Sequence, residues 1–163
     1  MHLWIRSEVR NFEKRVGITP NAVLELISKG FEVTVEESNS RALPIKEYRN
    51  AGANIVPSNS WPSAPDHAII FGLKELPENI ETLKHRHIMF GHAYKGQSGA
   101  SALLKRFKNG GGALYDLEYL LKKNGSRIAA FGYWAGFAGA AVSLKVWLHQ
   151  QNNKSPGPEN INI

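Results

Sequence analysis

Two short apolar runs in the middle of the chain each end at a glycine and lead into a loop with charged or titratable side chains. The runs are Ala68–Phe71 and His87–Phe90, and the loops that follow them carry Lys74 and His92. Such runs are typical of parallel strands that are buried on both faces. Because open α/β sheets build their sites at the carboxyl ends of their strands, we expect Lys74 and His92 at one rim of a sheet. A cation that can hold a carboxylate, beside a base that titrates near neutrality, predicts proton-transfer chemistry.

Other apolar segments alternate with helical patterns along the chain. Strands are expected over Leu3–Arg6, Phe31–Val35, Asn54–Val56, Ala68–Phe71, His87–Phe90, Ala113–Tyr115 and Arg127–Phe131. Helices are expected from the Thr19 cap to the Gly30 stop, over Pro44–Ala51, from Ser98 or Gly99 to the glycines after Asn109, and over Ala135–Gln150. This alternation predicts an α/β fold, a Rossmann-like, doubly wound and mainly parallel sheet with helices on both faces.

Composition limits the chemistry and the location that this chain can have. Its 163 residues, of which 42% are hydrophobic, fit one domain with a substantial core. The absence of cysteine excludes disulfides, thiolate nucleophiles and zinc–thiolate sites. The first residues do not form an apolar leader, and no window is long and apolar enough to span a membrane. We therefore expect a cytoplasmic protein without membrane partners.

The net charge of +6 comes from 20 Lys and Arg residues against 14 Asp and Glu residues. This balance permits nucleic-acid binding, and it also suits small anionic substrates such as dicarboxylates. The densest basic stretches, Lys84–His87, Lys105–Lys108 and Lys122–Lys123, are short and lie apart. Because a nucleic-acid module needs a contiguous basic face with stacking aromatic residues, the scattered charge favours a small-molecule substrate over nucleic acid.

Two basic residues are candidates for binding a carboxylate. Arg15 lies just before the first expected helix, where its planar guanidinium can meet a carboxylate close to helix amides. The alternative is a surface arginine paired with Glu8 or Glu13. Lys74 follows a strand end, where it can bind a carboxylate or act as an acid or base. The alternative is an exposed loop lysine paired with Glu75.

Three histidines form an H-x-H-x4-H pattern that invites a metal-site interpretation. His85 and His87 fall before or at the start of a strand, whereas His92 follows its end. At ~3.3 Å per residue, the strand separates them by more than ~15 Å. We therefore expect no metal site, and His92 alone is the candidate for acid/base work.

Glycines also open the longest expected helix, at Gly132, Gly136 and Gly139. Their spacing, G-x3-G-x2-G, differs from the dinucleotide fingerprint G-x-G-x-x-G, and no acidic residue follows ~20 positions later. We expect these glycines to allow close approach of another backbone. The helix over Gly132–Gln150 is then a surface on which a second domain could dock.

Several segments together resemble the NAD-dependent, lysine-forming saccharopine dehydrogenases, and more broadly the N-terminal domains of alanine dehydrogenases and proton-translocating transhydrogenases. The matching segments are Glu13–Pro20, Glu47–Ala53, Ile70–Pro77, Phe90–Gln97, Leu114–Leu120 and Arg127–Ala141. They occur in matching order and spacing over nearly all of residues 3 to 150. The GLKE motif followed by F-x-H-x-YK distinguishes saccharopine dehydrogenase from alanine dehydrogenase.

The resemblance implies a reaction and a cofactor. The family oxidises saccharopine with NAD and water, through an imine, to lysine, 2-oxoglutarate and NADH in lysine biosynthesis. It implies that Lys74 and His92 are the acid/base pair, with His92 managing protons during imine hydrolysis and Lys74 during hydride transfer. It also implies that Arg15 binds a substrate carboxylate.

Further substrate-binding residues follow from the same resemblance. Glu75 and Glu118 match acidic residues that tune the acid/base pair and receive the substrate amine. Lys95, Gln97 and Arg127 match positions that border the substrate cleft.

The resemblance also implies two domains, one that binds the substrate and one that binds the nucleotide, and these residues match only the first. Residues 1–150 match the N-terminal, substrate-binding and catalytic domain, and residues 151–163 are expected to be a linker or tail. The family's nucleotide-binding domain, which holds most of the NAD, is absent from these residues, so we expect a truncated chain that is inactive alone. An alternative remains: a non-catalytic or regulatory domain of the same fold that binds a carboxylated metabolite.

Overall fold

The computed structural model describes residues 1–94, 96–130 and 132–153. Its strands are β1 His2–Ile5, β2 Glu32–Glu36, β3 Asn54–Val56, β4 Ile69–Phe71, β5 Arg86–Met89 and β6 Ala113–Asp116. Its helices are α1 Pro20–Ser28, α2 Ile45–Asn50, the short 3₁₀ helix η1 Trp61–Ser63, α3 Ala100–Gly110 and α4 Tyr133–Asn153. These bounds agree with six of the expected strands and all of the expected helices to within a few residues.

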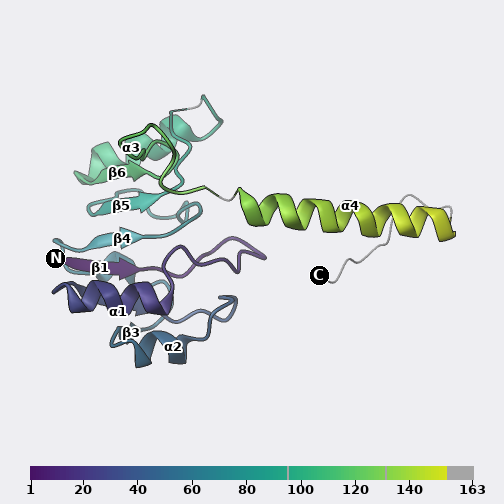
Figure 1. Cartoon of the computed structure of the whole chain (residues 1–163). Coiled ribbons are helices and arrows are strands. Elements are labelled where there is room, and N and C mark those ends of the chain that lie inside the picture. The colour runs from purple at the N-terminus through teal and green to yellow at the C-terminus, as the bar shows by residue number, and fades with distance from the viewer. Residues whose placement is uncertain (95, 131, 154–163) are drawn as a thin grey trace. The chain divides into compact units, whose positions relative to one another are not determined.

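The six strands form one all-parallel sheet in the order β3-β2-β1-β4-β5-β6 (Figure 1). The chain winds outward from β1 to β3, then returns to β4 beside β1 and winds outward in the other direction. Because such crossovers are right-handed, α1 and α2 cover one face of the sheet and α3 covers the other. The predicted Rossmann-like, doubly wound fold is confirmed. Its topological switch point lies where β1 and β4 adjoin, the place where open α/β sheets bind ligands.

The ends of the first helix follow the sequence signals. The Thr19 hydroxyl accepts a hydrogen bond from the Ala22 N–H at 3.3 Å, and Pro20 opens α1. After the helix, Gly30 adopts a φ of +83°, which a side-chain-bearing residue adopts only with strain. A helix bounded in this way places β2 directly alongside β1.

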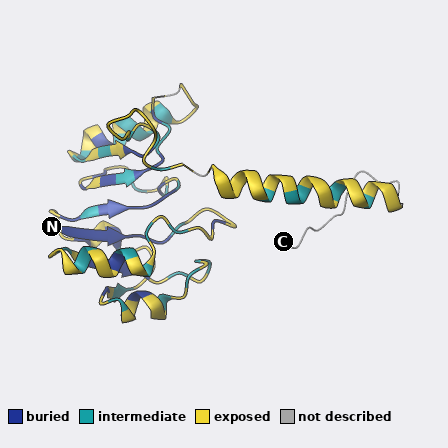
Figure 2. Cartoon of the chain, viewed as in Figure 1, coloured by how far each residue is buried: buried dark blue, intermediate teal, exposed yellow. Residues whose placement is uncertain are grey.

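The hydrophobic core lies along the central strands, which are buried in Figure 2. A cluster under α3 includes Trp4, Trp61, Ile70, Met89 and Phe107. Burying apolar side chains of this size contributes roughly 1.5–3 kcal/mol each, so the sheet centre is the most stable part of the fold.

The seventh expected strand, Arg127–Phe131, is wrong for the residues that the structure describes. Arg127 makes only an isolated antiparallel bridge to Leu121, and residues 128–130 join no ladder. A tight turn causes this: the Lys122 N–H donates to the Ser126 carbonyl at 2.7 Å, and Gly125 has a φ of +81°. The turn folds the chain back on itself before it can lie parallel to β6. Phe131 falls outside the described residues.

The chain divides into two compact units. The first is Met1–Arg127, which contains the whole sheet, and the second begins at Ile128 and contains α4. Among the described residues, none of the helices has the length and apolar character needed to cross a membrane.

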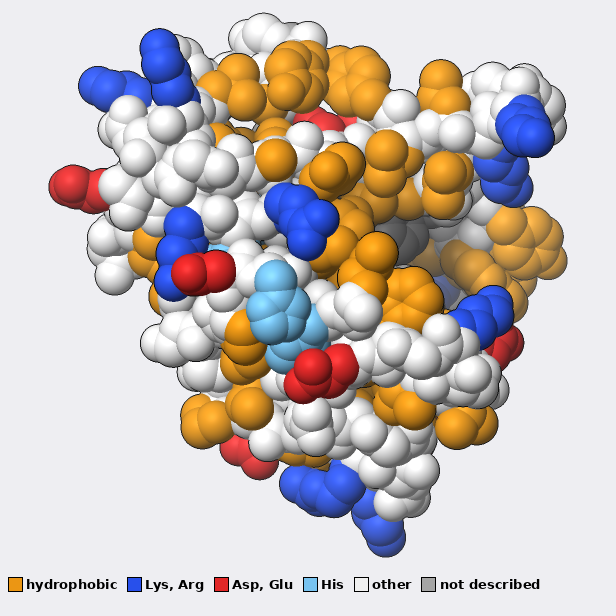
Figure 3. Space-filling view, turned by 90° about the vertical axis from the view of Figure 1, so that its left-hand side faces the viewer, with side chains coloured by type: hydrophobic (Ala, Val, Ile, Leu, Met, Phe, Trp, Pro, Cys, Tyr) orange, Lys and Arg blue, Asp and Glu red, His pale blue; other side chains and the backbone are white. Residues whose placement is uncertain are grey.

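Surface charge is mixed on the face that Figure 3 shows. Lysine and arginine side chains there are separated by acidic, histidine and hydrophobic side chains. This face therefore offers no continuous basic surface of the kind that a nucleic-acid module uses.

The buried carboxylate of Glu36, at the end of β2, joins the neighbouring loops. It accepts hydrogen bonds from the Trp4 indole at 3.0 Å, from the Ser7 N–H and hydroxyl at 2.8 Å, and from the Asn59 and Trp61 N–H groups at 2.9 and 2.6 Å. In a dinucleotide-binding domain an acidic residue near this place binds a ribose. Here the protein's own donors occupy it, so Glu36 acts as a structural anchor.

His87 is a buried histidine that favours the neutral state. Its ring packs edge-on against Trp61 at 5.0 Å and against Phe107 at 5.4 Å between ring centres. Its Nε2 has no hydrogen-bond partner among the described residues. Burial, together with the nearby charge of Arg6, lowers its pKa to about 3. A protonated imidazole here would be buried without a counter-charge.

Acidification is expected to destabilise the fold through His87. The unfolded chain binds a proton at this histidine below a pH of about 6.5, whereas the folded chain does so only near pH 3. Between these values the free energy of unfolding falls by up to about 1.4 kcal/mol for each pH unit lost. Urea unfolding of wild type and His87→Phe across this range measures the difference. Equal pH slopes for the two proteins would contradict the assignment.

Candidate functional site

The register of the central strands brings the loops after β4 and β5 to the same level. Phe71 lies beside Ile88, and beyond them the Phe90 N–H donates to the Leu73 carbonyl at 3.3 Å. The chain segments that carry Lys74 and His92 therefore leave the sheet next to each other, at its carboxyl edge.

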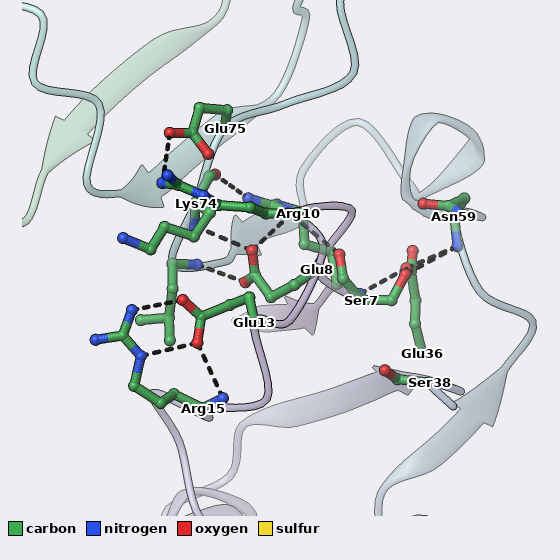
Figure 4. A network of polar contacts seen from close by, with 12 residues as sticks. Ser7, Glu8, Arg10, Glu13, Arg15, Glu36, Ser38, Asn59, Lys74 and Glu75 are labelled. Carbon is green, nitrogen blue, oxygen red and sulfur yellow. Dashed lines mark hydrogen bonds and ion pairs between the residues drawn. The ribbon is translucent and has the colours of Figure 1, made fainter. Parts of the chain in front are cut away.

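Two charged residues of the loop after β1, the buried Arg6 and the partly buried Glu8, hold the backbone of Lys74. The Glu8 carboxylate accepts the Lys74 N–H at 3.0 Å (Figure 4) and the Leu73 N–H at 2.6 Å. The Arg6 guanidinium donates to the Lys74 carbonyl. Burial lowers the pKa of Arg6, and Glu8 opposes that effect. A Cβ at Gly72 would collide with the Arg6 guanidinium, so only glycine leaves room for this contact. These contacts fix the backbone of Lys74 and leave its side chain to reach outward.

The Lys74 ammonium extends between two ion pairs, each of which includes an arginine from the loop after β1 (Figure 4). On one side Arg10 pairs with Glu75 at 3.2 Å, and both side chains are exposed. On the other side Arg15 pairs with Glu13. The expected alternative, a Lys74–Glu75 pair, is absent from the described residues, in which no carboxylate lies within ion-pair distance of the Lys74 ammonium. This lysine is therefore placed to meet a charged group of a ligand.

Arg15 forms a two-point ion pair with the buried carboxylate of Glu13. Its Nε donates to one oxygen at 2.8 Å and its Nη2 to the other at 2.5 Å. These bonds lower the pKa of Glu13 and raise that of Arg15, and the charge of Lys74 lowers the Glu13 pKa further. Pairing with Glu13, one of the two expected alternatives, is thus observed. Half of the Arg15 side chain is still exposed, so the pair orients the guanidinium without burying it.

His92 stands at the exit of β5 in an unusual backbone conformation, with a φ of +49°. Its ring stacks on Phe90, with 6.2 Å between ring centres. Its Nδ1 is buried, lies 3.8 Å from the Glu118 carboxylate and has no hydrogen-bond partner among the described residues. The His92 side chain is 35% exposed, so part of the ring reaches solvent. This is suitable geometry for a proton-transfer group backed by an acidic residue.

Glu118 joins two of the expected site residues. Its side chain is 10% exposed, and the same oxygen that faces His92 accepts a hydrogen bond from Arg127 at 3.0 Å. Arg127 therefore helps to fix the position of the Glu118 carboxylate.

Some of the expected site residues line two neighbouring hollows. Arg15 lines the smaller one, together with Glu13 and Leu73. Glu75 and His92 line the larger one, and Lys74, Glu118 and Arg127 line neither. The structure therefore does not bring Arg15 and His92 into one hollow, although the segment from Leu73 to Glu75 contributes to both.

Two other expected residues have different outcomes. Gln97 lines the larger hollow, just before the start of α3. Lys95 lies outside the described residues. Among the described residues, no group of three or more His, Cys, Asp or Glu side chains could hold a metal ion.

Three charged residues that support the site, of which Arg6 and Asp116 are buried and Glu8 is partly buried, were not among the expected site residues. Arg6 and Glu8 hold the Lys74 segment, and Asp116 holds the loop of His92. The usable signal was their position, since each stands at or just after the end of a strand. Sequence alone does not show which charged residues at such places turn inward.

Comparison with known proteins identifies the family. Residues 4–138 match the family model described as the alanine dehydrogenase/PNT N-terminal domain. The chain belongs to this family. The domain is also similar in sequence to the lysine-forming, NAD(+) saccharopine dehydrogenase of Schizosaccharomyces pombe, with 51% identity over 150 residues. That match covers 91% of this chain and 41% of the S. pombe protein, so the chain spans less than half of this relative.

More distant proteins share the domain. The mitochondrial alpha-aminoadipic semialdehyde synthase of Rattus norvegicus is 32% identical over 134 residues, which cover 82% of this chain and 14% of that protein. The fold is similar to that of an L-alanine dehydrogenase, with a TM-score of 0.66 and 19% identity over 96% of this chain and 43% of the other. It is also similar to a transhydrogenase from Sinorhizobium meliloti, with a TM-score of 0.59 and 21% identity over 76% of this chain and 36% of the other.

Proposed function

We propose that this domain supplies the proton-transfer and carboxylate-binding groups of an NAD-dependent, lysine-forming saccharopine dehydrogenase. One observation carries the proposal: neighbouring parallel strands present Lys74 and His92 at the same level of the carboxyl edge. The similarity to the S. pombe enzyme supports the choice of substrate. Saccharopine has three carboxylates and a secondary amine, and the site has both cations and acids to receive them.

The two proposed catalytic residues act at different steps. NAD, when bound by a second domain, would accept the hydride from the substrate carbon. Lys74 takes the proton that leaves the amine nitrogen, and together these two losses give the imine. His92 then removes a proton from the water that attacks the imine carbon, and returns one to the nitrogen as the carbon–nitrogen bond breaks. Glu118, 3.8 Å from Nδ1, stabilises the imidazolium that forms between these transfers. Arg15 binds a substrate carboxylate, and Glu75 and Gln97 border the cleft. The family resemblance alone assigns Lys95 to substrate binding.

The residues of this chain do not fit NAD. The 163 residues contain no G-x-G-x-x-G sequence, and internal donors occupy the acidic residue at the end of β2. We assign residues 1–150 to the substrate domain and residues 151–163 to a linker. A nucleotide-binding domain outside these residues would hold the cofactor.

The second domain is proposed to dock on Gly132–Gln150. Residues 133–144, the first half of α4, contain no charged residue. The Trp134 ring packs edge-on against Tyr133, with 5.1 Å between ring centres, and edge-on against Phe137, with 5.9 Å between them. A helix this apolar is typical of one that another element covers.

Two proteins test the proposal. The 163-residue chain alone is expected to give no NADH from saccharopine and NAD, because it cannot hold the cofactor against the substrate. A chimera, in which this chain replaces the matching segment of the S. pombe enzyme, is expected to be active. Initial rates of NADH formation measure both. Clear turnover by the chain alone would contradict the proposal that a domain outside these residues holds NAD.

The placement of Arg15 and His92 in separate hollows favours a second candidate, a non-catalytic domain that binds a carboxylated metabolite. An inactive chimera whose isolated domain still binds saccharopine in calorimetry would support this alternative.

A further inference from the structure

The carboxylate of Asp116 accepts hydrogen bonds from the backbone of the loop that carries His92. Asp116 ends β6 and is buried, with 5% of its surface exposed. One of its oxygens accepts the Gly91 N–H at 3.2 Å, and the other accepts the Ala93 N–H at 3.3 Å. These two amides flank His92 on either side. Asp116 therefore holds the backbone N–H groups of the residues before and after the candidate acid/base residue.

This clamp explains the backbone of His92. A φ of +49° is uncommon for a residue with a large side chain, and such a conformation persists only where its surroundings enforce it. The two hydrogen bonds to Asp116 provide that enforcement. At Gly91, a Cβ would come within 2.8 Å of the Leu114 side chain and 3.4 Å of the Asp116 carboxylate, so a larger residue there would have to displace Leu114.

The same carboxylate also positions the acidic partner of His92. The oxygen that accepts the Gly91 N–H also accepts the Glu118 N–H at 3.0 Å. That bond sets the turn after β6, which carries the Glu118 side chain to 3.8 Å from His92 Nδ1. One buried group thus determines where both members of the pair stand.

We propose that Asp116 is a positioning residue for catalysis: its carboxylate fixes His92 and Glu118 in their mutual geometry without touching substrate. The inference rests on the proposed function for its link to turnover, but the positioning itself is a property of the isolated chain. Three N–H groups converge on the Asp116 carboxylate, which matches an ionised acceptor and fits an amide poorly.

Asp116→Asn tests the proposal with little change in shape. If the asparagine oxygen takes the place that serves Gly91 and Glu118, the NH₂ group faces the Ala93 N–H, and two donors meet. In the 163-residue chain, we expect amide exchange at Ala93 to accelerate at least ~10-fold, because that bond is lost, and the His92 Cα and Cβ shifts to move. In the chimera we expect kcat to fall about 10- to 100-fold, with a KM for saccharopine within about threefold of the parent.

The matched control is Asp66→Asn, the same change at an exposed aspartate near the amino end of β4. It is expected to leave the Ala93 exchange rate, the His92 shifts, kcat and KM unchanged. Wild-type exchange and shifts in Asp116→Asn would overturn the positioning role, whatever the chimera does. A displaced loop with an unchanged kcat would overturn its link to catalysis. An inactive parent chimera would instead count against the proposed function, and the exchange and shift measurements would still decide the positioning role.

Discussion

Replacing His92 by glutamine in the chimeric dehydrogenase is expected to lower kcat about 10²- to 10⁴-fold, the usual contribution of a positioned acid or base. Glutamine retains polarity and approximate size but cannot exchange a proton at neutral pH. Lys74→Met is expected to cause a loss of similar size. Steady-state rates with saccharopine and NAD measure both effects.

The two substitutions are expected to slow different steps. Lys74 is assigned to oxidation of the amine, so Lys74→Met should increase the primary deuterium isotope effect of saccharopine labelled at the oxidised carbon. His92→Gln should decrease it, because imine hydrolysis then limits turnover. His67→Gln is the control, since His67 is an exposed histidine just before β4, at the opposite edge of the sheet. A kcat for His92→Gln within threefold of the parent would remove His92 from the catalytic assignment.

Much of the fold could be predicted because its signals are local. The buried runs before Gly72 and Gly91 are too short and too apolar for surface helices, and they are strands in the structure. The strand expected at Arg127 failed for a non-local reason: a strand needs a partner, and the turn at Gly125 directs Arg127 back to Leu121 instead. Apolar character alone does not show which residues will pair with a neighbouring strand.

The candidate site could be predicted in part for the same reason. The rule that sites gather at the carboxyl ends of parallel strands selected Lys74 and His92, and the register places them level. The inward turn of Asp116 and Glu8 depends on which backbone amides converge there, and only the folded loops determine that. The Arg15–Glu13 pair shows the same limit, because sequence offered Glu8 and Glu13 as equal partners.

Arg15→Gln is expected to raise the KM of the chimera for saccharopine about 30- to 300-fold, the cost of losing a charge-assisted contact to a carboxylate. The structure adds a second effect. Without the Arg15 guanidinium the buried Glu13 carboxylate loses the side-chain bonds that contribute most to its lowered pKa, and Lys74 is the cation whose charge already acts on it. We expect Glu13 then to attract the Lys74 ammonium, so that kcat falls as well.

The double variant Arg15→Gln with Glu13→Gln separates these two effects. Removing the unpaired carboxylate should restore most of kcat, because Lys74 is released, whereas KM should stay high because no guanidinium remains. Since the Glu13 pKa lies below its ordinary value, the pair is intact at neutral pH and is lost only as the pH falls through that lowered value. Arg49→Gln, at an exposed arginine on α2, is the matched control. If KM in Arg15→Gln equals that of Arg49→Gln, the Arg15 guanidinium serves the fold of the β1 exit loop and does not bind substrate.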